Sequence, residues 1–518
     1  MALVLIGFMG AGKSTVAAGL ASELGVAALD SDALLEAQFG HSLAREFELA
    51  GEESFRASEE ELVCRLLERG GPEEVIALGG GSVLSERVRR ALENHVTVLL
   101  DIDTDTAWER VREPAGTAQR PLAGDPQSFA RLHAERRGLY EGLADAVLPS
   151  PTLAAARSAL GTLHSLEGAP KGTRMVWASS ASGDYPVILG HGLLAADDGE
   201  ALAGLWPLPR ASSRGFCVSD ENVAGLYGGR LGKLAGSIAI AAGEAHKTLV
   251  SAEKVWQGML EMGATRADHI VALGGGVVGD LAGFCAATYQ RGIPVVQVPT
   301  TLVAQVDSAF GGKTGVDLPR AKNYIGVYHQ PAGVIVDPDV LATLPAAEYA
   351  SGWVEVLKTA LIAGGELWEE VASGGALGEQ TIFACIRTKL AVVAADERDG
   401  GRRQVLNLGH TVGHAIETVT HYARYRHGEA VGLGLLAALR LSGQDQLRGQ
   451  VCALLAARGL PVHADGLSAE EMLAAIARDK KRLGASVPFV LVQAPGDVRH
   501  GCEVAESDLR SAIAELSG

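Results

Sequence analysis

The sequence predicts an α/β protein in which two parallel-sheet parts are followed by a helical part. Apolar runs that resemble buried strands alternate with helical stretches through residue 150, which indicates a parallel sheet with flanking helices. A second α/β pattern begins near Met175, and from Ala346 onward the apolar periodicity is helical, so we expect an all-helical final part. The strand-like runs are residues 3–6, 75–78, 96–100, 216–219, 237–240, 270–273 and 295–298.

Length and composition indicate a multidomain protein that handles small molecules. At 518 residues the chain is too long for one ordinary hydrophobic core. Its net charge of −17 argues against nucleic-acid or membrane partners, although local clusters of Lys and Arg can still bind small anionic substrates. The six cysteines include no Cys-x-x-Cys pair, which is typical of reduced thiols in a cytoplasmic protein. No apolar run is long enough to span a bilayer.

Residues 7–14 match the phosphate-binding P-loop pattern Gly-x-x-x-x-Gly-Lys-Ser and directly follow a strand-like run. In such a loop the glycines allow backbone N–H groups to surround the phosphates. Lys13 reaches the outer phosphates, and the Ser14 hydroxyl can ligate Mg²⁺. The motif predicts ATP or GTP binding. A GTPase remains open on this motif alone, but the chain has no Asn-Lys-x-Asp segment that would recognise guanine.

A second glycine-rich turn, Gly274-Gly275-Gly276, follows the strand-like run 270–273 and precedes a helix that we expect to begin near Asp280. Glycines at this place let the backbone approach the pyrophosphate of a dinucleotide, and the helix N-terminus supplies N–H donors. The triplet alone is equally typical of a tight structural turn, and its spacing departs from the standard Rossmann fingerprint.

Residues farther along the chain have the spacing of a catalytic metal site. His410 and His414 are four residues apart, which places them on one face of a helix, and His427 follows shortly after. Glu355 lies in an earlier helical segment. One carboxylate with two imidazoles leaves a position on Zn²⁺ open for substrate, as catalytic sites require. The pattern favours metal or phosphate chemistry over histidines that only pack or face solvent.

Five further segments of the first part occur in the order found in one kinase family. They are Asp30-Ser31-Asp32, Gly51-Glu52-x-x-Phe55-Arg56, Leu78-Gly79-Gly80-Gly81, Arg120-Pro121-Leu122 and Arg136-x-x-x-Tyr140. Together with the P-loop they make residues 1–165 resemble shikimate kinase. The resemblance implies ATP as co-substrate, Mg²⁺ as its metal, and phosphorylation of shikimate at its 3-hydroxyl.

The same resemblance assigns roles in this segment. Asp32 would bind the shikimate hydroxyls and assist deprotonation, while Arg56 and Arg136 would hold the carboxylate. We prefer Arg136 to its neighbour because of its spacing to Tyr140. Arg120, on the lid, would contact the phosphates and take part in catalysis with Lys13 and Asp32. Asp30 would order water around the magnesium that Ser14 ligates. The ATP loop comprises Gly10, Ala11, Gly12, Lys13, Ser14 and Thr15, and the turn that admits the shikimate ring comprises Gly79, Gly80 and Gly81.

Residues 175–518 resemble 3-dehydroquinate synthase. The matching segments include Gly243-Glu244, Gly274 to Asp280, Pro299-Thr300-Thr301-Leu302, Gly311-Gly312-Lys313-Thr314, Lys322-Asn323, Glu355-Val356-Leu357-Lys358 and the histidine segment. The resemblance implies NAD and Zn²⁺ as cofactors, with Co²⁺ tolerated. Its substrate would be 3-deoxy-arabino-heptulosonate 7-phosphate, which is cyclised to 3-dehydroquinate with release of phosphate. A homodimer through this part of the chain is also implied.

The resemblance also assigns the residues of this second site. Glu355, His410 and His427 would bind zinc, and Arg291 would reach the substrate phosphate from a neighbouring subunit. Lys313, Lys358, Arg403 and His414 would be catalytic, with His414 a candidate proton relay. Residues for NAD would be Asp220, Glu244, Lys247, Gly276, Val277, Val278, Gly279, Asp280, Thr300, Thr301, Lys313, Lys322 and Thr343. Residues for the heptulosonate would be Arg291, Asp307, Lys313, Asn323, Lys358, Lys389, Arg403, Asn407, His414 and Lys480, where Lys481 is the alternative to Lys480.

We therefore expect a bifunctional enzyme of the shikimate pathway. The expected divisions are a P-loop kinase domain at 1–167, a linker at 168–174, an α/β NAD-binding half at 175–345 and a helical zinc and substrate half at 346–518. Three alternatives remain open: a metal-dependent polyol dehydrogenase, a cyclase for a different sugar phosphate such as sedoheptulose 7-phosphate, and a regulator in which one half has lost catalysis. The last would be expected to lack Lys13, Asp32 or a zinc ligand, and none is missing.

Overall fold

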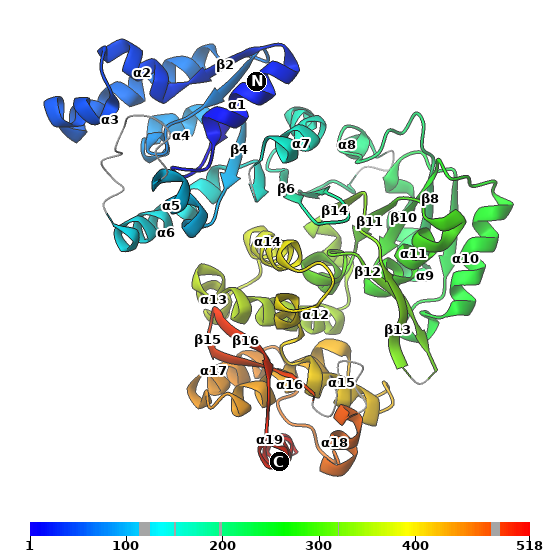
Figure 1. Ribbon diagram of the computed structural model, residues 1–518. Coiled ribbons are helices and arrows are strands. Elements are labelled where there is room, and N and C mark those ends of the chain that lie inside the picture. The colour runs from blue at the N-terminus through cyan, green and yellow to red at the C-terminus, as the bar shows by residue number, and fades with distance from the viewer. Residues whose placement is uncertain (113–124, 150–151, 196–198, 320, 478–486, 518) are drawn as a thin grey trace. The chain divides into compact units, whose positions relative to one another are not determined.

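The computed structural model describes residues 1–112, 125–149, 152–195, 199–319, 321–477 and 487–517. The chain forms two compact units, which are treated separately below (Figure 1). The first comprises Met1–Ser179, Asp184–Leu193 and Glu200–Pro207. The second comprises Ser180–Gly183, Leu194–Gly199 and Leu208–Gly518.

The first unit contains a sheet in the order β2-β3-β1-β4-β5-β6-β7, parallel except for the last pair. The expected strands at 3–6, 75–78 and 96–100 are confirmed with shifts of about one residue. Central β1 is buried along its whole length, as in parallel sheets covered on both faces. The strands are β1 (Leu3–Ile6), β2 (Ala27–Asp30), β3 (Glu74–Ala77), β4 (Val96–Asp101), β5 (Ala146–Pro149), β6 (Arg174–Ala178) and β7 (Tyr185–Leu189).

Helices connect these strands and bring the first set of predicted site residues to one edge of the sheet. Because β1, β2 and β3 are parallel, the P-loop, Asp32 and the Gly79–Gly81 turn all follow carboxyl ends of neighbouring strands. The helices are α1 (Lys13–Leu24), α2 (Ser31–Phe39), α3 (Leu43–Arg69), α4 (Glu86–Leu92), α5 (Thr104–Arg112), α6 (Pro126–Leu143), α7 (Leu153–Ser165) and α8 (Glu200–Ala203).

The second unit begins with a parallel sheet in the order β14-β11-β10-β8-β9. Its helix α11 (Gly276–Thr288) begins at Gly276 and not near Asp280 as expected, because the chain turns from strand to helix within the glycine triplet. An antiparallel hairpin, β12 (Lys313–Leu318) and β13 (Ala321–Tyr328), follows. The other elements are β8 (Gly215–Asp220), α9 (Glu221–Tyr227), β9 (Gly236–Ile240), α10 (Leu249–Glu261), β10 (His269–Gly274), β11 (Val295–Pro299) and β14 (Gly333–Val336).

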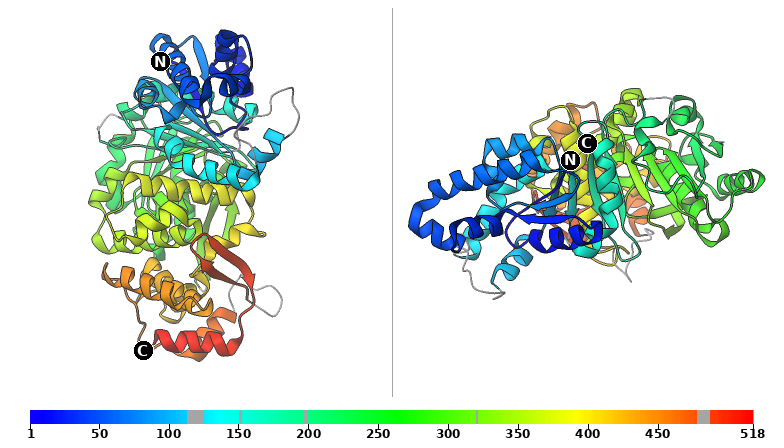
Figure 2. Two further views of the ribbon diagram at one scale, coloured as in Figure 1. Left: turned by 90° about the vertical axis from the view of Figure 1, so that its left-hand side faces the viewer. Right: turned by 90° about the horizontal axis from the view of Figure 1, so that it is seen from above.

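The last part of the second unit is dominated by helices, which Figure 2 shows in yellow to red. It also contains a hairpin, β15 (Phe489–Ala494) and β16 (Asp497–Cys502), which the expectation of an all-helical part did not include. A valine-containing apolar run at residues 489–492, followed by the turn-forming Pro495-Gly496, is the sequence signal for it. The helices are α12 (Ala346–Ala363), α13 (Gly365–Ala372), α14 (Glu379–Ala395), α15 (His410–Val419), α16 (His427–Leu441), α17 (Asp445–Ala456), α18 (Ala469–Ala477) and α19 (Glu506–Leu516).

Glycines allow α16 to lie against both α15 and α12. A Cβ at Gly434 would collide with the carbonyl oxygen of Gly409, and a Cβ at Gly428 would collide with that of Ser351. These close approaches hold the first turns of α15 and α16 beside α12, and each of these three helices carries one predicted zinc ligand. Among the described residues, no helix combines the length and apolar character needed to cross a membrane.

Replacing Gly434 by Ala should therefore destabilise the second unit by about 1–3 kcal/mol, because the added methyl group must push α16 away from α15. Gly449→Ala is the matched control, since Gly449 is exposed in α17 with open space around it. That change should stabilise the chain by about 0.5–1 kcal/mol through helix propensity. Differential scanning calorimetry measures both. Equal stability of the two variants would contradict the packing argument.

Candidate active sites

The P-loop of the first unit has the backbone conformation that the motif predicts. Gly10 and Gly12 both have φ of +83°, which side chains disfavour, and α1 begins directly afterwards at Lys13. Lys13 Nζ donates to the carbonyl oxygens of Gly7 (2.8 Å) and Phe8 (3.2 Å), so the lysine lies across its own loop. Such a loop followed directly by a helix N-terminus can supply backbone N–H donors to a phosphate.

A second cation at this loop was not expected from the sequence. Arg110, in α5, donates from Nη1 to the Gly10 carbonyl oxygen at 3.3 Å. It belongs to no motif, so only the three-dimensional fold identifies it. Arg120, expected on the lid, lies outside the described residues.

The glycine turn after β3 gathers the residues expected to bind shikimate. A Cβ at Gly79 would lie 2.5 Å from Asp32 Oδ1, and one at Gly81 would collide with the Arg56 guanidinium. Arg136 Nη1 donates to the Gly80 carbonyl oxygen at 3.4 Å. The structure thus brings Asp32, Arg56 and Arg136 together around this turn.

Two neighbours order this group. The buried Glu59 carboxylate, missed in the sequence, lies 2.6 Å from Arg56 Nη1 and accepts a hydrogen bond from Ser82 Oγ at 2.8 Å. Its place one helical turn after Arg56 is the signal that could have identified it. Tyr140 donates its hydroxyl to the Gly80 carbonyl oxygen at 2.5 Å. Burial raises the pKa of Tyr140 to about 12, against the opposing charge of Arg136, so the phenol remains a donor.

The neighbouring arginine and the expected magnesium residue have other partners. Arg137 is exposed and pairs with Glu141, with 2.7 Å between Nε and Oε1. The Asp30 carboxylate caps α2 by accepting from the N–H groups of Asp32 (3.0 Å) and Ala33 (3.1 Å).

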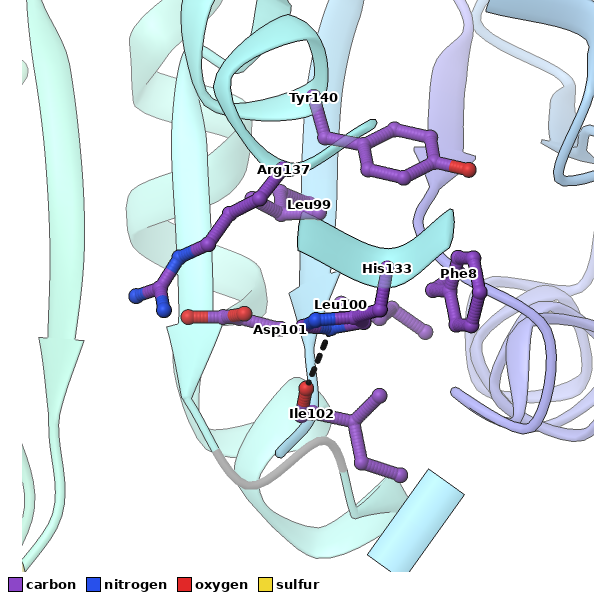
Figure 3. A pocket seen from close by; sticks show the side chains of 8 residues that line it. All are labelled: Phe8, Leu99, Leu100, Asp101, Ile102, His133, Arg137 and Tyr140. Atoms are coloured by element: carbon purple, nitrogen blue, oxygen red, sulfur yellow. Dashed lines mark hydrogen bonds between the residues drawn. The ribbon is translucent and has the colours of Figure 1, made fainter. Parts of the chain in front are cut away.

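A small pocket lies beside Phe8 of the P-loop (Figure 3). Phe8 packs edge-on against the imidazole of His133, whose Nε2 lies 3.1 Å from the Ile102 carbonyl oxygen. The pocket contains none of the residues expected to bind ATP or shikimate. Its lining residues are Phe8, Leu99, Leu100, Asp101, Ile102, His133, Arg137 and Tyr140.

In the second unit, the three residues expected to bind zinc converge. Glu355 Oε1 lies 3.6 Å from His410 Nε2 and 3.3 Å from His427 Nε2. One ligand atom from each residue lies within 4.8 Å of the others. The outer nitrogens have acceptors, since His410 Nδ1 is 3.1 Å from the Leu408 carbonyl oxygen and His427 Nδ1 is 3.4 Å from Glu417 Oε1. Both Nε2 atoms therefore face the same point, as metal ligands do.

The charges around this point fit a divalent cation. Glu355 is fully buried, and among the described residues neither of its oxygens accepts a hydrogen bond of ordinary geometry, although Lys358 Nζ approaches to 2.5 Å. Burial alone would lower the pKa of His427, yet Glu355 and Glu417 raise it to about 10. The carboxylates therefore favour positive charge, and one carboxylate with two imidazoles suits Zn²⁺ or Co²⁺.

Buried cations surround Asp307 next to this cluster. Lys358 Nζ lies 2.8 Å from Asp307 Oδ2, and Lys389 contacts the same carboxylate and donates to the Asp307 carbonyl oxygen at 2.7 Å. Burial, assisted by neighbouring cations and opposed by Asp307, lowers the pKa of Lys389 to about 8. Burial opposes ionisation of Asp307, but the two lysines hold its pKa well below the usual range.

Some of the remaining residues expected to bind substrate lie near this cluster. His414 lies one turn after His410, with ring centroids 5.3 Å apart, and Asn407 ends the turn before α15. Arg403 is buried and donates from Nη2 to the Gly311 carbonyl oxygen at 2.9 Å, while Lys313 Nζ pairs with Asp399 at 2.6 Å. Asp399 was not anticipated.

Two other members of the expected set, Arg291 and Asn323, lie on other elements of the second unit. Arg291 follows the C-terminal end of α11, and the helix, about 20 Å long, separates it from the glycine turn. Asn323 donates its N–H to Asp317 Oδ1 at 2.7 Å, within the β12–β13 hairpin. Lys480, with its alternative Lys481, lies outside the described residues.

The glycine turn after β10 faces polar groups that suit a dinucleotide. A Cβ at Gly275 would lie 2.8 Å from Thr301, and a Cβ at Gly276 would lie 3.0 Å from Ser308 Oγ. The buried hydroxyls of Thr300 and Ser308 have no hydrogen-bond partner among the described residues. Space for backbone contact and unpaired hydroxyls at one turn fit a phosphate group.

Other expected NAD residues pair with charged or polar neighbours in the second unit. Lys247 Nζ lies 2.9 Å from Glu244 and 3.3 Å from Asp280. Asp220 caps α9, and Thr343 Oγ1 lies 2.8 Å from the Tyr227 hydroxyl. Val278 is buried, so only its backbone is available, and Lys322 pairs with Glu417.

Comparison with known proteins assigns both parts. Residues 9–167 match the shikimate kinase family, residues 237–351 the 3-dehydroquinate synthase N-terminal family, and residues 352–482 its C-terminal family. The 3-dehydroquinate synthase of Halorhodospira halophila is 43% identical over 359 residues, covering 66% of this chain and 99% of that protein. The enzyme of Gloeobacter violaceus is also 43% identical, covering 62% and 93%.

A solved structure shares the fold of the second part. The 2-epi-5-epi-valiolone synthase from Streptomyces hygroscopicus subsp. jinggangensis 5008, with NAD⁺ and Zn²⁺ bound, is 27% identical with a TM-score of 0.59. The alignment covers 66% of this chain and 98% of that one. The chain therefore belongs to the 3-dehydroquinate synthase family and also carries a shikimate kinase domain, two enzymes of the shikimate pathway on one polypeptide.

Proposed function

We propose that the two sites described above carry the two activities independently. In this proposal residues 1–167 phosphorylate shikimate and residues 175–518 cyclise 3-deoxy-arabino-heptulosonate 7-phosphate, with 168–174 as the linker. Within the second enzyme, 175–345 bind NAD and 346–518 bind the metal and substrate. The observation that carries the proposal is that each site gathers its own set of charged groups: the P-loop with Lys13 in one, and the Glu355 cluster with its buried lysines in the other.

For the kinase, we infer that Lys13 leaves its loop carbonyls to contact the outer phosphates of ATP. Asp32 lies beside the glycine turn, where it can accept the proton of the attacking hydroxyl. Arg56, held by Glu59, and Arg136, beside Gly80, supply two cations for the shikimate carboxylate. Phosphoryl transfer requires alignment and charge neutralisation more than covalent chemistry, and this set provides both.

For the synthase, Glu355, His410 and His427 would hold Zn²⁺ or Co²⁺, and the turn at Gly274–Gly276 would hold NAD. When bound, the metal acidifies a substrate hydroxyl and the nicotinamide accepts and returns a hydride, so no net oxidation results. Lys358, Lys389 and Arg403 would neutralise the carboxylate and phosphate of the heptulosonate. His414 lies beside the metal cluster, where it can move a proton as phosphate departs.

Two rival activities share this architecture. A polyol dehydrogenase would produce NADH, but its neutral substrate has no need for the buried lysines around Asp307. A cyclase for another sugar phosphate would use similar cations, and product identification distinguishes it. We further propose that the synthase part forms a homodimer, in which Arg291 completes a neighbouring site, and that the protein works in the cytoplasm.

Lys13→Met should lower shikimate-dependent ADP formation by at least about 100-fold, because the phosphates lose their principal side-chain cation. Phosphate release from the heptulosonate should remain at the wild-type rate. His410→Ala should have the opposite effect. Coupled assays for ADP and inorganic phosphate on each variant measure the two activities separately. Independence would be disproved by a folded variant in which one change abolishes both activities.

Arg136→Lys should raise the KM for shikimate by roughly 10–100-fold, since lysine cannot reproduce bidentate carboxylate binding. Arg137→Lys is the matched control, because Arg137 is exposed and pairs with Glu141; this change should leave the KM unchanged. Steady-state kinetics with varied shikimate test both variants. If the control shows the larger effect, the assignment of the inward-facing arginine is wrong.

Removing the metal with a chelator should abolish phosphate release from the heptulosonate, because no Lewis acid then acidifies the substrate hydroxyl. Without the metal, Glu355 pairs with Lys358 and His427. Adding Zn²⁺ or Co²⁺ should restore it, and NADH should not accumulate at any stage. Phosphate release, NADH absorbance and product identification are followed together. Full activity of metal-free protein would refute the assigned metal role.

A further inference from the structure

Glu417 is a buried carboxylate between two functional groups of the second site. Its side chain is only 3% exposed, and it lies on α15, two turns after His410. Oε1 is 3.4 Å from His427 Nδ1 and 3.2 Å from Lys322 Nζ. Glu417 belongs to neither the proposed metal ligands nor the NAD set.

Glu417 accepts a hydrogen bond from Nδ1 of His427, as a backbone carbonyl does from Nδ1 of His410. An acceptor at Nδ1 fixes the proton on that nitrogen and leaves Nε2 free to bind a metal. For His410 the acceptor is the Leu408 oxygen, which is fixed by the backbone. For His427 the acceptor is a charged side chain, so its orientation depends on what else holds that carboxylate.

On the other side, Glu417 holds Lys322 at the start of β13. The same ammonium group lies 3.7 Å from Glu244 and 4.5 Å from the ring centroid of Tyr422. Lys322 is therefore clamped between the helical part and the nucleotide-binding part of the second unit. Glu417 is the most buried of these partners, and its charge is the least screened.

We propose that Glu417 is a positioning residue shared by two parts of the synthase site: it orients the metal ligand His427 through Nδ1 and anchors the β12–β13 hairpin through Lys322. The inference rests on the proposed metal site and extends it. Because one oxygen serves both groups, loss of Glu417 weakens metal binding and releases the hairpin, whereas loss of Lys322 releases the hairpin alone.

The test compares full-length wild type with Glu417→Gln, Glu417→Ala and Lys322→Met. Zinc affinity is measured by competition with a chromophoric chelator, and hairpin order by backbone hydrogen exchange at residues 313–328. Glu417→Ala should weaken zinc binding by about 10–100-fold, the usual effect of removing an outer partner of a metal-bound histidine. Lys322→Met should retain wild-type zinc affinity. Both variants should show faster exchange in the hairpin.

Glu417→Gln separates the two roles with little change in shape. Its amide oxygen can still accept a hydrogen bond from His427 Nδ1, so zinc binding should weaken less than in the alanine variant. Because the amide carries no negative charge to hold the Lys322 ammonium group, the hairpin should exchange as fast as in Lys322→Met. The visible spectrum of bound Co²⁺ should change in both Glu417 variants and remain unaltered in Lys322→Met. Shikimate-dependent ADP formation reports the amount of active chain in each sample.

Wild-type zinc affinity in both Glu417 variants would overturn the proposal, as would wild-type hairpin exchange in both. Equal loss of zinc affinity in Lys322→Met and Glu417→Ala would also overturn it, because the effect would then pass through the lysine. His410→Ala distinguishes this failure from failure of the proposed function. If His410→Ala binds zinc as tightly as wild type, the metal site itself is wrong.

Discussion

Matching buried negative charge with positive charge is the constraint on which both sites depend. The chain carries a net charge of −17, yet its substrates are anions, so each site must create a local positive field. The buried carboxylates Glu59, Asp307 and Glu355 achieve this because each retains cations that would otherwise be costly to bury. These carboxylates thus hold the arginine and lysine side chains in position before substrate binds.

The Asp307 group illustrates how such a network can receive a substrate. Lys358 and Lys389 both contact the Asp307 carboxylate, and Lys358 also contacts Glu355. Burial, together with the neighbouring cations, lowers the pKa of Lys389 to about 8. A substrate anion entering beside these lysines would favour their charged forms and would find its partners already desolvated.

Sequence reasoning identified the parts of the sites that local pattern determines. The P-loop follows from glycine spacing, whereas the convergence of His410 and His427 with Glu355 was implied by the resemblance to 3-dehydroquinate synthase. The strand positions were close because parallel strands buried on both faces are continuously apolar. Arg136 was separated from Arg137 by its one-turn distance to Tyr140, and the structure places it at Gly80.

The residues that were missed have ordinary local contexts. Arg110, Glu59 and Glu417 are charged residues on helices, where most such side chains are solvated, and only tertiary contacts bring them to a site. The start of α11 was placed too late because the glycine triplet was taken as a loop. The hairpin at 489–502 was overlooked because helical periodicity on both sides of it was extended through it.

The two sites solve the problem of anion binding in different ways, and the sequence reflects the difference. The P-loop relies on backbone N–H groups, so it needs glycines at positive φ and only a few cations. The synthase cluster relies on side chains from three helices, so its glycines serve a different purpose: they remove Cβ atoms where α16 meets α15 and α12. Glycine-rich segments in this chain therefore indicate phosphate-binding backbone in one unit and close helix packing in the helical part of the other. Only the neighbouring residues, lysine and serine in one case and histidine in the other, distinguish the two uses.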